Sequence, residues 1–160
     1  NTAGEKINDI ARVANQLNFL KNGNKVSFVK NRNINYTNQC YYKCGFCGFS
    51  KGPKSFNRKE KPYSIDIQEV VDRTTEAFEM GASEVCLQGG IHPDYTGEFY
   101  LNMVKEIKQT TPDMHIHGFT PLEICQGAET INLSIEEYLK LLLDAGLNTL
   151  PGTAAEILDD

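Results

Sequence analysis

The chain has 160 residues, of which 40% are hydrophobic and 23% charged, and its formal net charge is −5. This length and composition are typical of one globular domain and exclude a disordered chain. The acidic balance argues against a nucleic-acid-binding protein, and no apolar run approaches the roughly 18 residues that a membrane span needs. We therefore expect a globular protein without nucleic-acid or membrane partners.

Helix-like and strand-like segments alternate along the first half of the chain. We expect a helix at about residues 4–20 and a strand at residues 33–38, which leads into a cysteine-rich segment. A helix follows within residues 64–81, because one helical face collects Ile67, Val70, Val71, Ala77 and Phe78. Asp66 and Glu69 have capping-box spacing before this helix, and Gly81 ends it.

The second half of the chain repeats this alternation. We expect strands at residues 82–90, 113–119 and 147–152, and helices at residues 97–112 and 133–146. Ser134 and Glu137 have capping-box spacing at the start of the second of these helices, and Gly146 ends it. A further helix is expected to begin within residues 153–160.

Alternating strands and helices predict an α/β fold with a parallel sheet and outer helices. A doubly wound open sheet would satisfy the pattern, but no G-x-G-x-x-G follows the first strand. A TIM-type (β/α) barrel fits as well, and complete barrels usually contain about 250 residues. We therefore expect residues 31–160 to form the N-terminal half of such a barrel in a truncated chain, after a helical extension at residues 1–30.

Three of the five cysteines, Cys40, Cys44 and Cys47, lie close together after the first predicted strand. Their crowding indicates thiolates that bind a metal in a reducing compartment, so we expect a cytoplasmic location. Gly45 and Gly48 disfavour a buried helix face, since glycine weakens a helix interior. A structural zinc site or a ferredoxin-type cluster normally has a fourth protein ligand. Three thiolates favour a 4Fe-4S cluster with one iron open to a substrate, and a zinc-stabilised binding module is the alternative.

Other unusual residues also follow predicted strands. Gln88, Gly89 and Gly90 end the second strand, where glycines allow a ligand to approach the backbone. His115 and His117 share one face of the third strand, and we expect His117, nearer the carboxyl end, to contact substrate or cofactor. For His115 we expect a hydrogen-bonded core position.

Thr153 and Glu156 follow the fourth predicted strand. Their spacing is that of a capping box, which explains them without any ligand. They also lie at a helix N-terminus on the predicted rim, where contact with an anionic part of a cofactor is the functional alternative.

The C-x-x-x-C-x-x-C spacing, with Phe46 before the last cysteine, resembles the radical S-adenosylmethionine (SAM) enzymes. The resemblance implies that the three cysteines hold three irons of a 4Fe-4S cluster and that the fourth iron binds SAM. It also implies that Phe46 lies beside the adenine and that segment 88–90 meets the methionine amino group.

A narrower resemblance starts at Asn31. The segments "GASEVCLQGGIHPDYTGEFY", "HIHGFTPLEI" and "LPGTAAEILDD" resemble the tyrosine-using subunit of the FO synthase family. The resemblance implies a transferase that joins the 4-hydroxybenzyl group of L-tyrosine to 5-amino-6-(D-ribitylamino)uracil in deazaflavin coenzyme biosynthesis. It also implies a companion FO synthase subunit or domain and an electron donor such as ferredoxin or flavodoxin. Futalosine-pathway enzymes of menaquinone biosynthesis share these motifs and are the alternative.

Overall fold

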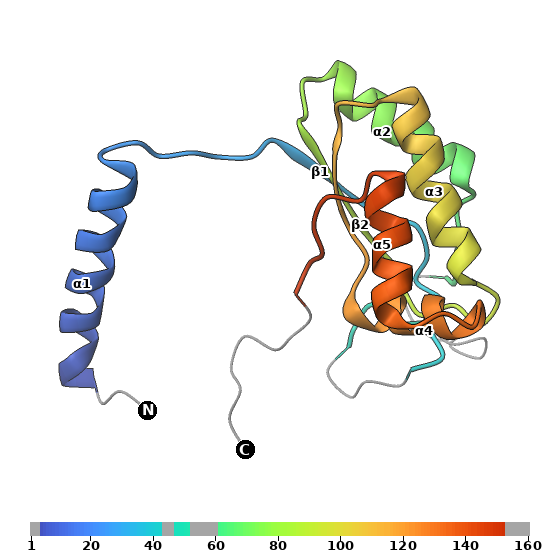
Figure 1. Cartoon of the computed structure of the whole chain (residues 1–160), viewed down its shortest axis with the longest axis horizontal. Helices are drawn as coiled ribbons and strands as arrows, with labels where there is room; N and C mark the ends of the chain where they lie inside the picture. The colour runs from blue at the N-terminus through green and yellow to red at the C-terminus, as the bar shows by residue number, and fades with distance from the viewer. Residues whose placement is uncertain (1–3, 43–46, 52–60, 153–160) are drawn as a thin grey trace.

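The computed structural model describes residues 4–42, 47–51 and 61–152. A parallel sheet in the order β1-β2-β3 lies at its centre (Figure 1), formed by β1 (Asn31–Asn35), β2 (Glu84–Gln88) and β3 (His115–Gly118). A helix separates each strand from the next along the chain. These are the βα units expected for a barrel of parallel strands.

Helices cover one side of the sheet (Figure 1). α2 (Ile67–Glu79) and α3 (Gly97–Thr110) pack side by side, and α4 (Pro121–Thr130) and α5 (Ile135–Ala145) pack on α3. α1 (Gly4–Asn22) lies apart from this body, and its residues from Lys6 onward are exposed. Among the described residues, no helix combines the length and apolar character that a membrane crossing requires.

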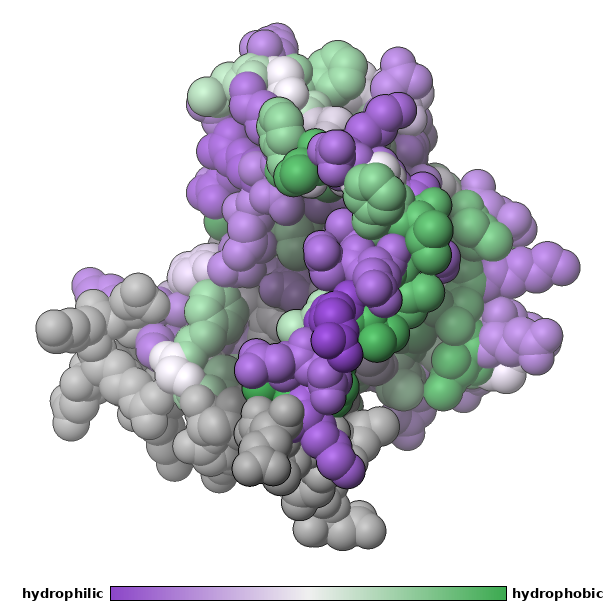
Figure 2. All heavy atoms as spheres, turned by 90° about the vertical axis from the view of Figure 1, so that its left-hand side faces the viewer, coloured by the Kyte–Doolittle hydropathy of each residue, from purple (hydrophilic) through white to green (hydrophobic). Residues whose placement is uncertain are grey.

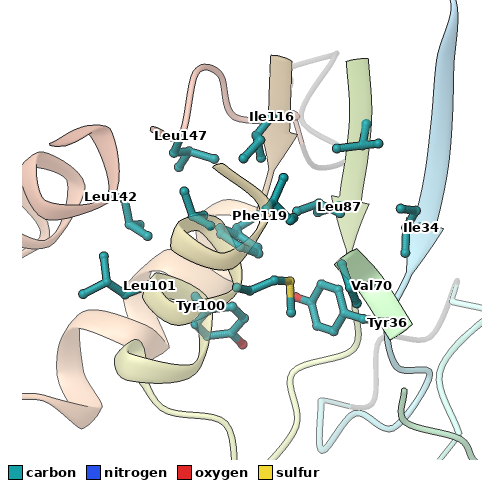
Figure 3. Packing of buried hydrophobic residues seen from close by; sticks show 14 of the residues in the cluster. Ile34, Tyr36, Val70, Leu87, Tyr100, Leu101, Ile116, Phe119, Leu142 and Leu147 are labelled. Atoms are coloured by element: carbon teal, nitrogen blue, oxygen red, sulfur yellow. The ribbon is translucent and has the colours of Figure 1, made fainter. Parts of the chain in front are cut away.

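The core lies between the sheet and these helices (Figure 3). Alternation along the strands turns Ile34, Val85, Leu87 and Ile116 toward the helices, where they are fully buried. The helices contribute further buried side chains, among them Val70, Tyr100, Met103, Ile107 and Leu142. Burial of these apolar surfaces holds the layers together.

The opposite face of the sheet is polar. The strand register puts Asn33, Cys86 and His117 in one row across the three strands. A second row contains Asn31, Glu84 and His115. In a closed barrel this face would point inward.

Local signals at helix ends are confirmed. The Asp66 side chain accepts the Glu69 N–H at the start of α2, and Ser134 and Glu137 form a reciprocal capping box at the start of α5. Gly146 ends α5 with a φ of 112°, a left-handed conformation that favours glycine.

Several expectations are wrong. Residues 121–130 form α4, although their weak apolar periodicity predicts no helix. The predicted strand at residues 147–152 is reduced to one parallel bridge between His117 and Thr149. Phe78 is 43% exposed, because buried Val70, Thr74 and Ala77 form the centre of the inner face of α2. β1 lies two residues earlier than expected, and the helix expected within residues 153–160 falls outside the described residues.

Candidate functional site

The carboxyl ends of the three strands meet at one edge of the sheet, as predicted. The Gly90 N–H donates to the Thr37 carbonyl at 2.9 Å, which joins the exits of β2 and β1. The Phe119 N–H donates to the Leu87 carbonyl at 3.1 Å, which joins the exits of β3 and β2. Residues that follow any of these strands therefore reach a shared rim.

Cys40 lies on this rim, at the exit of β1. Its N–H donates to the Lys51 carbonyl at 3.4 Å, and the Lys51 N–H donates to the Asn38 carbonyl at 2.8 Å. The backbone therefore leaves the sheet at Cys40 and comes back beside it at Lys51. Lys51 is buried, and its Nζ donates to the Gly48 carbonyl at 3.0 Å.

Cys47 lies on the returning part of the same loop. Its half-buried sulfur accepts the Ser50 N–H at 3.4 Å. Cys44 and Phe46 fall outside the described residues, so the structure positions two members of the predicted cysteine trio. Within the described ranges no three His, Cys, Asp or Glu side chains form a metal site by themselves.

Gly89 and Gly90 allow the exits of β1 and β2 to approach closely. A Cβ on Gly89 would lie 2.4 Å from the Tyr36 ring, and one on Gly90 would lie 2.2 Å from the Gln39 carbonyl oxygen. Among the described residues, no donor bonds to the carbonyl oxygens of Gly89 and Gly90. Unoccupied carbonyl acceptors beside Cys40 suit a ligand that carries an ammonium group.

Glu123 was not among the predicted site residues, yet it lies behind this rim. Its side chain is fully buried. Its Oε1 accepts the Tyr36 hydroxyl and, at 3.2 Å, the Gly89 N–H, while its Oε2 accepts the Thr120 N–H at 2.7 Å. Burial raises the pKa of this carboxyl group to about 8, although the hydrogen bonds from Thr120 and Gly89 act in the opposite direction.

Aromatic rings enclose the Tyr36 side chain behind the glycine pair. The ring centroids of Tyr95, Phe99 and Phe119 lie 6.2, 6.0 and 6.3 Å from that of Tyr36. The hydroxyl of Tyr100, in the same cluster, is buried and has no hydrogen-bond partner among the described residues. An apolar wall of this kind excludes water from one side of the rim.

His117 lies on the polar face of the sheet, near the rim. Its Nδ1 lies 2.6 Å from Thr149 Oγ1, and His115 Nε2 lies 2.9 Å from the same oxygen. A hydroxyl has one proton to donate, so at least one of the two rings donates its own N–H to Thr149. His115 also lies 3.7 Å from Glu84 Oε2 and is half-buried, which makes it a hydrogen-bonded residue of the polar face rather than of the apolar core.

The remaining predicted residues divide into two groups. Gln88 is half-buried at the end of β2, on the same face as Cys86 and beside the glycine pair. Thr153 and Glu156 fall outside the described residues. The two cysteines outside the trio differ, since Cys86 is half-buried in β2 and Cys125 is exposed on α4.

Comparison with known proteins identifies the family of the chain. The model of the radical SAM superfamily matches residues 34–159. A 5-amino-6-(D-ribitylamino)uracil–L-tyrosine 4-hydroxyphenyl transferase from Methanopyrus kandleri is 45% identical over 148 residues, which cover 92% of this chain and 39% of that protein. FO synthases from Mycobacterium tuberculosis and Streptomyces coelicolor are 45% and 41% identical over 157 residues, covering 98% of this chain and 18% of each relative.

Solved structures show the same fold at much lower identity. HydG, a maturase of the FeFe-hydrogenase, matches with a TM-score of 0.63 at 17% identity and covers 95% of this chain and 31% of that chain. HydG from Carboxydothermus hydrogenoformans matches with a TM-score of 0.59 at 15% identity, over 95% of this chain and 42% of that chain. The chain therefore has the α/β fold of part of a radical SAM barrel.

Proposed function

Because the chain belongs to the radical SAM superfamily, we propose that it is the cluster-binding part of a tyrosine-using FO synthase enzyme. The intact protein would join the 4-hydroxybenzyl group of L-tyrosine to 5-amino-6-(D-ribitylamino)uracil. The observation that carries this proposal is the 45% identity to a named transferase with that pair of substrates, together with Cys40 and Cys47 on one loop at the exit of β1.

Enzymes of this superfamily use a 4Fe-4S cluster and SAM, and the residues at the rim fit both groups. Cys40, Cys44 and Cys47 would hold the cluster, and Phe46 would lie beside the adenine of SAM. The carbonyl oxygens of Gly89 and Gly90, which no described residue occupies, would accept hydrogen bonds from an amino group. When bound, the two groups supply the one-electron chemistry that removes a hydrogen atom from the substrate.

Other residues would orient the ligands. Gln88 lies beside the glycine pair, and Thr153 and Glu156 would contact the cosubstrate from the segment that follows the bridge at Thr149. His117 would contact the substrate from the polar face, where Thr149 already fixes its ring. The aromatic cluster around Tyr36 would keep water from the back of the rim.

The wider assignment follows from the same resemblance. We propose residues 1–30 as an N-terminal helical extension and residues 31–160 as the first half of the barrel. The intact enzyme would work with a companion FO synthase subunit or domain and accept electrons from a ferredoxin or flavodoxin. A thiolate-bound cluster requires a reducing compartment, so we place the enzyme in the cytoplasm.

A product assay tests the proposal. The intact protein, reconstituted anaerobically with iron and sulfide, is incubated with SAM, a reductant, tyrosine and 5-amino-6-(D-ribitylamino)uracil. We expect mass spectrometry to detect the coupled product with wild-type protein and with Cys125→Ala, which changes an exposed cysteine of α4 outside the three-cysteine motif, but not with Cys40→Ala. A reconstituted, iron-loaded wild-type protein that forms no coupled product would overturn the substrate assignment.

A further inference from the structure

Glu123 connects the three strand ends that form the rim. Through one carboxyl group it bonds Tyr36, which follows β1, Gly89, which follows β2, and Thr120, which follows β3. Tyr36 lies 87 residues before Glu123 in the chain, and Gly89 lies 34 residues before it. The carboxyl group is therefore a junction between strands, as well as part of a helix cap.

The helix cap alone does not explain why this carboxyl group is buried. Glu137 has the same position in the capping box of α5 that Glu123 has in that of α4. It accepts a hydrogen bond from the Ser134 N–H, but its side chain is exposed to solvent. Burial of a carboxyl group is unfavourable unless its oxygens are hydrogen-bonded. Glu123 differs from Glu137 in its two long-range donors, Tyr36 and Gly89.

The bond to Gly89 restrains a segment that is otherwise very free. Two consecutive glycines sample more backbone conformations than any other pair of residues. A peptide unit is planar and trans, so an anchored N–H also fixes the direction of the carbonyl in the same unit. Glu123 fixes the unit that contains the Gln88 carbonyl and the Gly89 N–H, where the glycine pair begins, and the Thr37 carbonyl fixes the next unit, which contains the Gly89 carbonyl.

Resting on the function proposed above, we propose that Glu123 is a positioning residue that holds the Gly89–Gly90 backbone in the orientation that binds the ammonium group of SAM. Glu123 does not touch SAM itself, since its oxygens face Tyr36, Gly89 and Thr120. It acts through the peptide unit that it anchors. The cluster ligands lie on a different loop, so loss of this anchor should leave the cluster in place.

The test measures SAM binding separately from cluster assembly. The intact protein is reconstituted anaerobically as wild type, Glu123→Ala, Glu123→Gln, Glu123→Asp and Glu137→Ala. Iron and sulfide per chain report the cluster, equilibrium dialysis gives the SAM dissociation constant, and electron paramagnetic resonance of the reduced cluster reports its response to added SAM. Glu137→Ala is the matched control, because it removes the same capping-box residue from an exposed helix start.

We expect Glu123→Ala to keep wild-type iron and sulfide and to weaken SAM binding about ten- to a hundredfold, the effect of leaving a buried hydrogen-bond donor without its acceptor. Glu123→Gln keeps an oxygen for the Gly89 N–H and should bind SAM within about threefold of wild type, as should Glu137→Ala. Glu123→Asp keeps the charge but is one methylene shorter, so it should resemble Glu123→Ala. The SAM-dependent change in the resonance spectrum should weaken in parallel.

Two results would overturn the inference. One is a wild-type SAM dissociation constant in Glu123→Ala, or in Glu123→Asp if the alanine variant does not fold. The other is a loss of SAM binding in Glu123→Gln as large as that in Glu123→Ala, which would show that an oxygen acceptor for the Gly89 N–H is not what matters. Wild-type protein that assembles no cluster or binds no SAM would instead overturn the proposed function.

Discussion

At the scale of single residues, a buried carboxyl group and a pair of glycines set the geometry of the rim. Glu123 is fully buried and bonded by donors from three strand ends. Gly90 contacts the Gln39 backbone so closely that no side chain fits between them. Both features have consequences for stability that can be measured independently of catalysis.

The ionisation of Glu123 should make stability depend on pH. Its pKa in the folded chain is about 8 against an ordinary value of 4.5, so folding favours the neutral form. As pH rises through this window the unfolded chain ionises first, and the stabilisation present below 4.5 is lost by about pH 8. Glu123→Gln has no such ionisation.

Urea unfolding of the intact protein over this pH range checks the prediction. The free energy of unfolding of wild type, relative to that of Glu123→Gln, should fall steadily as pH rises. The other titratable groups near this carboxyl, Tyr36 and Tyr138, are present in both proteins and cancel in the difference. A difference that stays constant or grows with pH would refute the assigned pKa direction.

Gly90→Ala should destabilise the protein. The added Cβ would lie 2.2 Å from the Gln39 carbonyl oxygen and 2.9 Å from Cys40 Cβ, so the backbone would have to move. Overpacking of this kind typically costs about 1–3 kcal/mol. Gly48→Ala is the control, since no described residue lies within 4 Å of its added Cβ, and we expect a change below about 0.5 kcal/mol. Equal urea midpoints for the two variants would contradict the close approach.

At the scale of elements, local signals explain what could be predicted and what could not. α2, α3 and α5 have a continuous apolar face, and their boundaries agree with the expectation to within a few residues. α4 is short, and its stability depends on packing against α3 and α5 rather than on its own periodicity. The capping box of Thr120 and Glu123, with Pro121 between them, was the available signal for it.

The site residues likewise divide into those that a local sequence pattern reveals and those that depend on distant contacts. The cysteine spacing and the glycine pair are recognisable in short stretches of sequence, and the described members of both lie on the rim. The role of Glu123 depends on Tyr36 and Gly89, which are 87 and 34 residues away, so no local pattern could reveal it. The strand predicted at residues 147–152 is also not fixed by local sequence. Among the described residues it forms a single bridge, from Thr149 to His117.

The caps of α4 and α5 provide a prediction at this scale. Thr120→Ala and Ser134→Ala each remove a side-chain oxygen that accepts a backbone N–H at the helix start. Each should lower the free energy of unfolding of the intact protein by about 1 kcal/mol. If Thr120→Ala leaves the urea midpoint unchanged while Ser134→Ala lowers it, the capping box of α4 does not contribute as the structure indicates.

At the scale of the whole molecule, the chain presents surfaces that usually lie inside a barrel. The polar sheet face with His117 and Cys86 is half-buried and open on one side. Figure 2, which faces the side of α1, shows hydrophobic side chains at the surface among hydrophilic ones, and Ile10, Leu17 and Phe28 are exposed. Exposed apolar patches and an open sheet edge favour association.

The isolated chain of 160 residues should therefore associate. We expect size-exclusion chromatography with light scattering to show dimers or larger species rather than a single monomer peak, and thermal unfolding to be broad. A monodisperse monomer with a sharp, cooperative transition would show that these surfaces do not require a partner.

We propose that Cys40, Cys44 and Cys47 together hold one 4Fe-4S cluster, which would supply the electron that cleaves SAM. The most direct measurement compares iron content and 5′-deoxyadenosine release in the intact, anaerobically reconstituted protein with alanine at each of these positions, and at Cys125 as the control. We expect about four irons and release of 5′-deoxyadenosine for wild type and Cys125→Ala, and loss of both in each of the other three variants. Wild-type release of 5′-deoxyadenosine by any one of those three would contradict it.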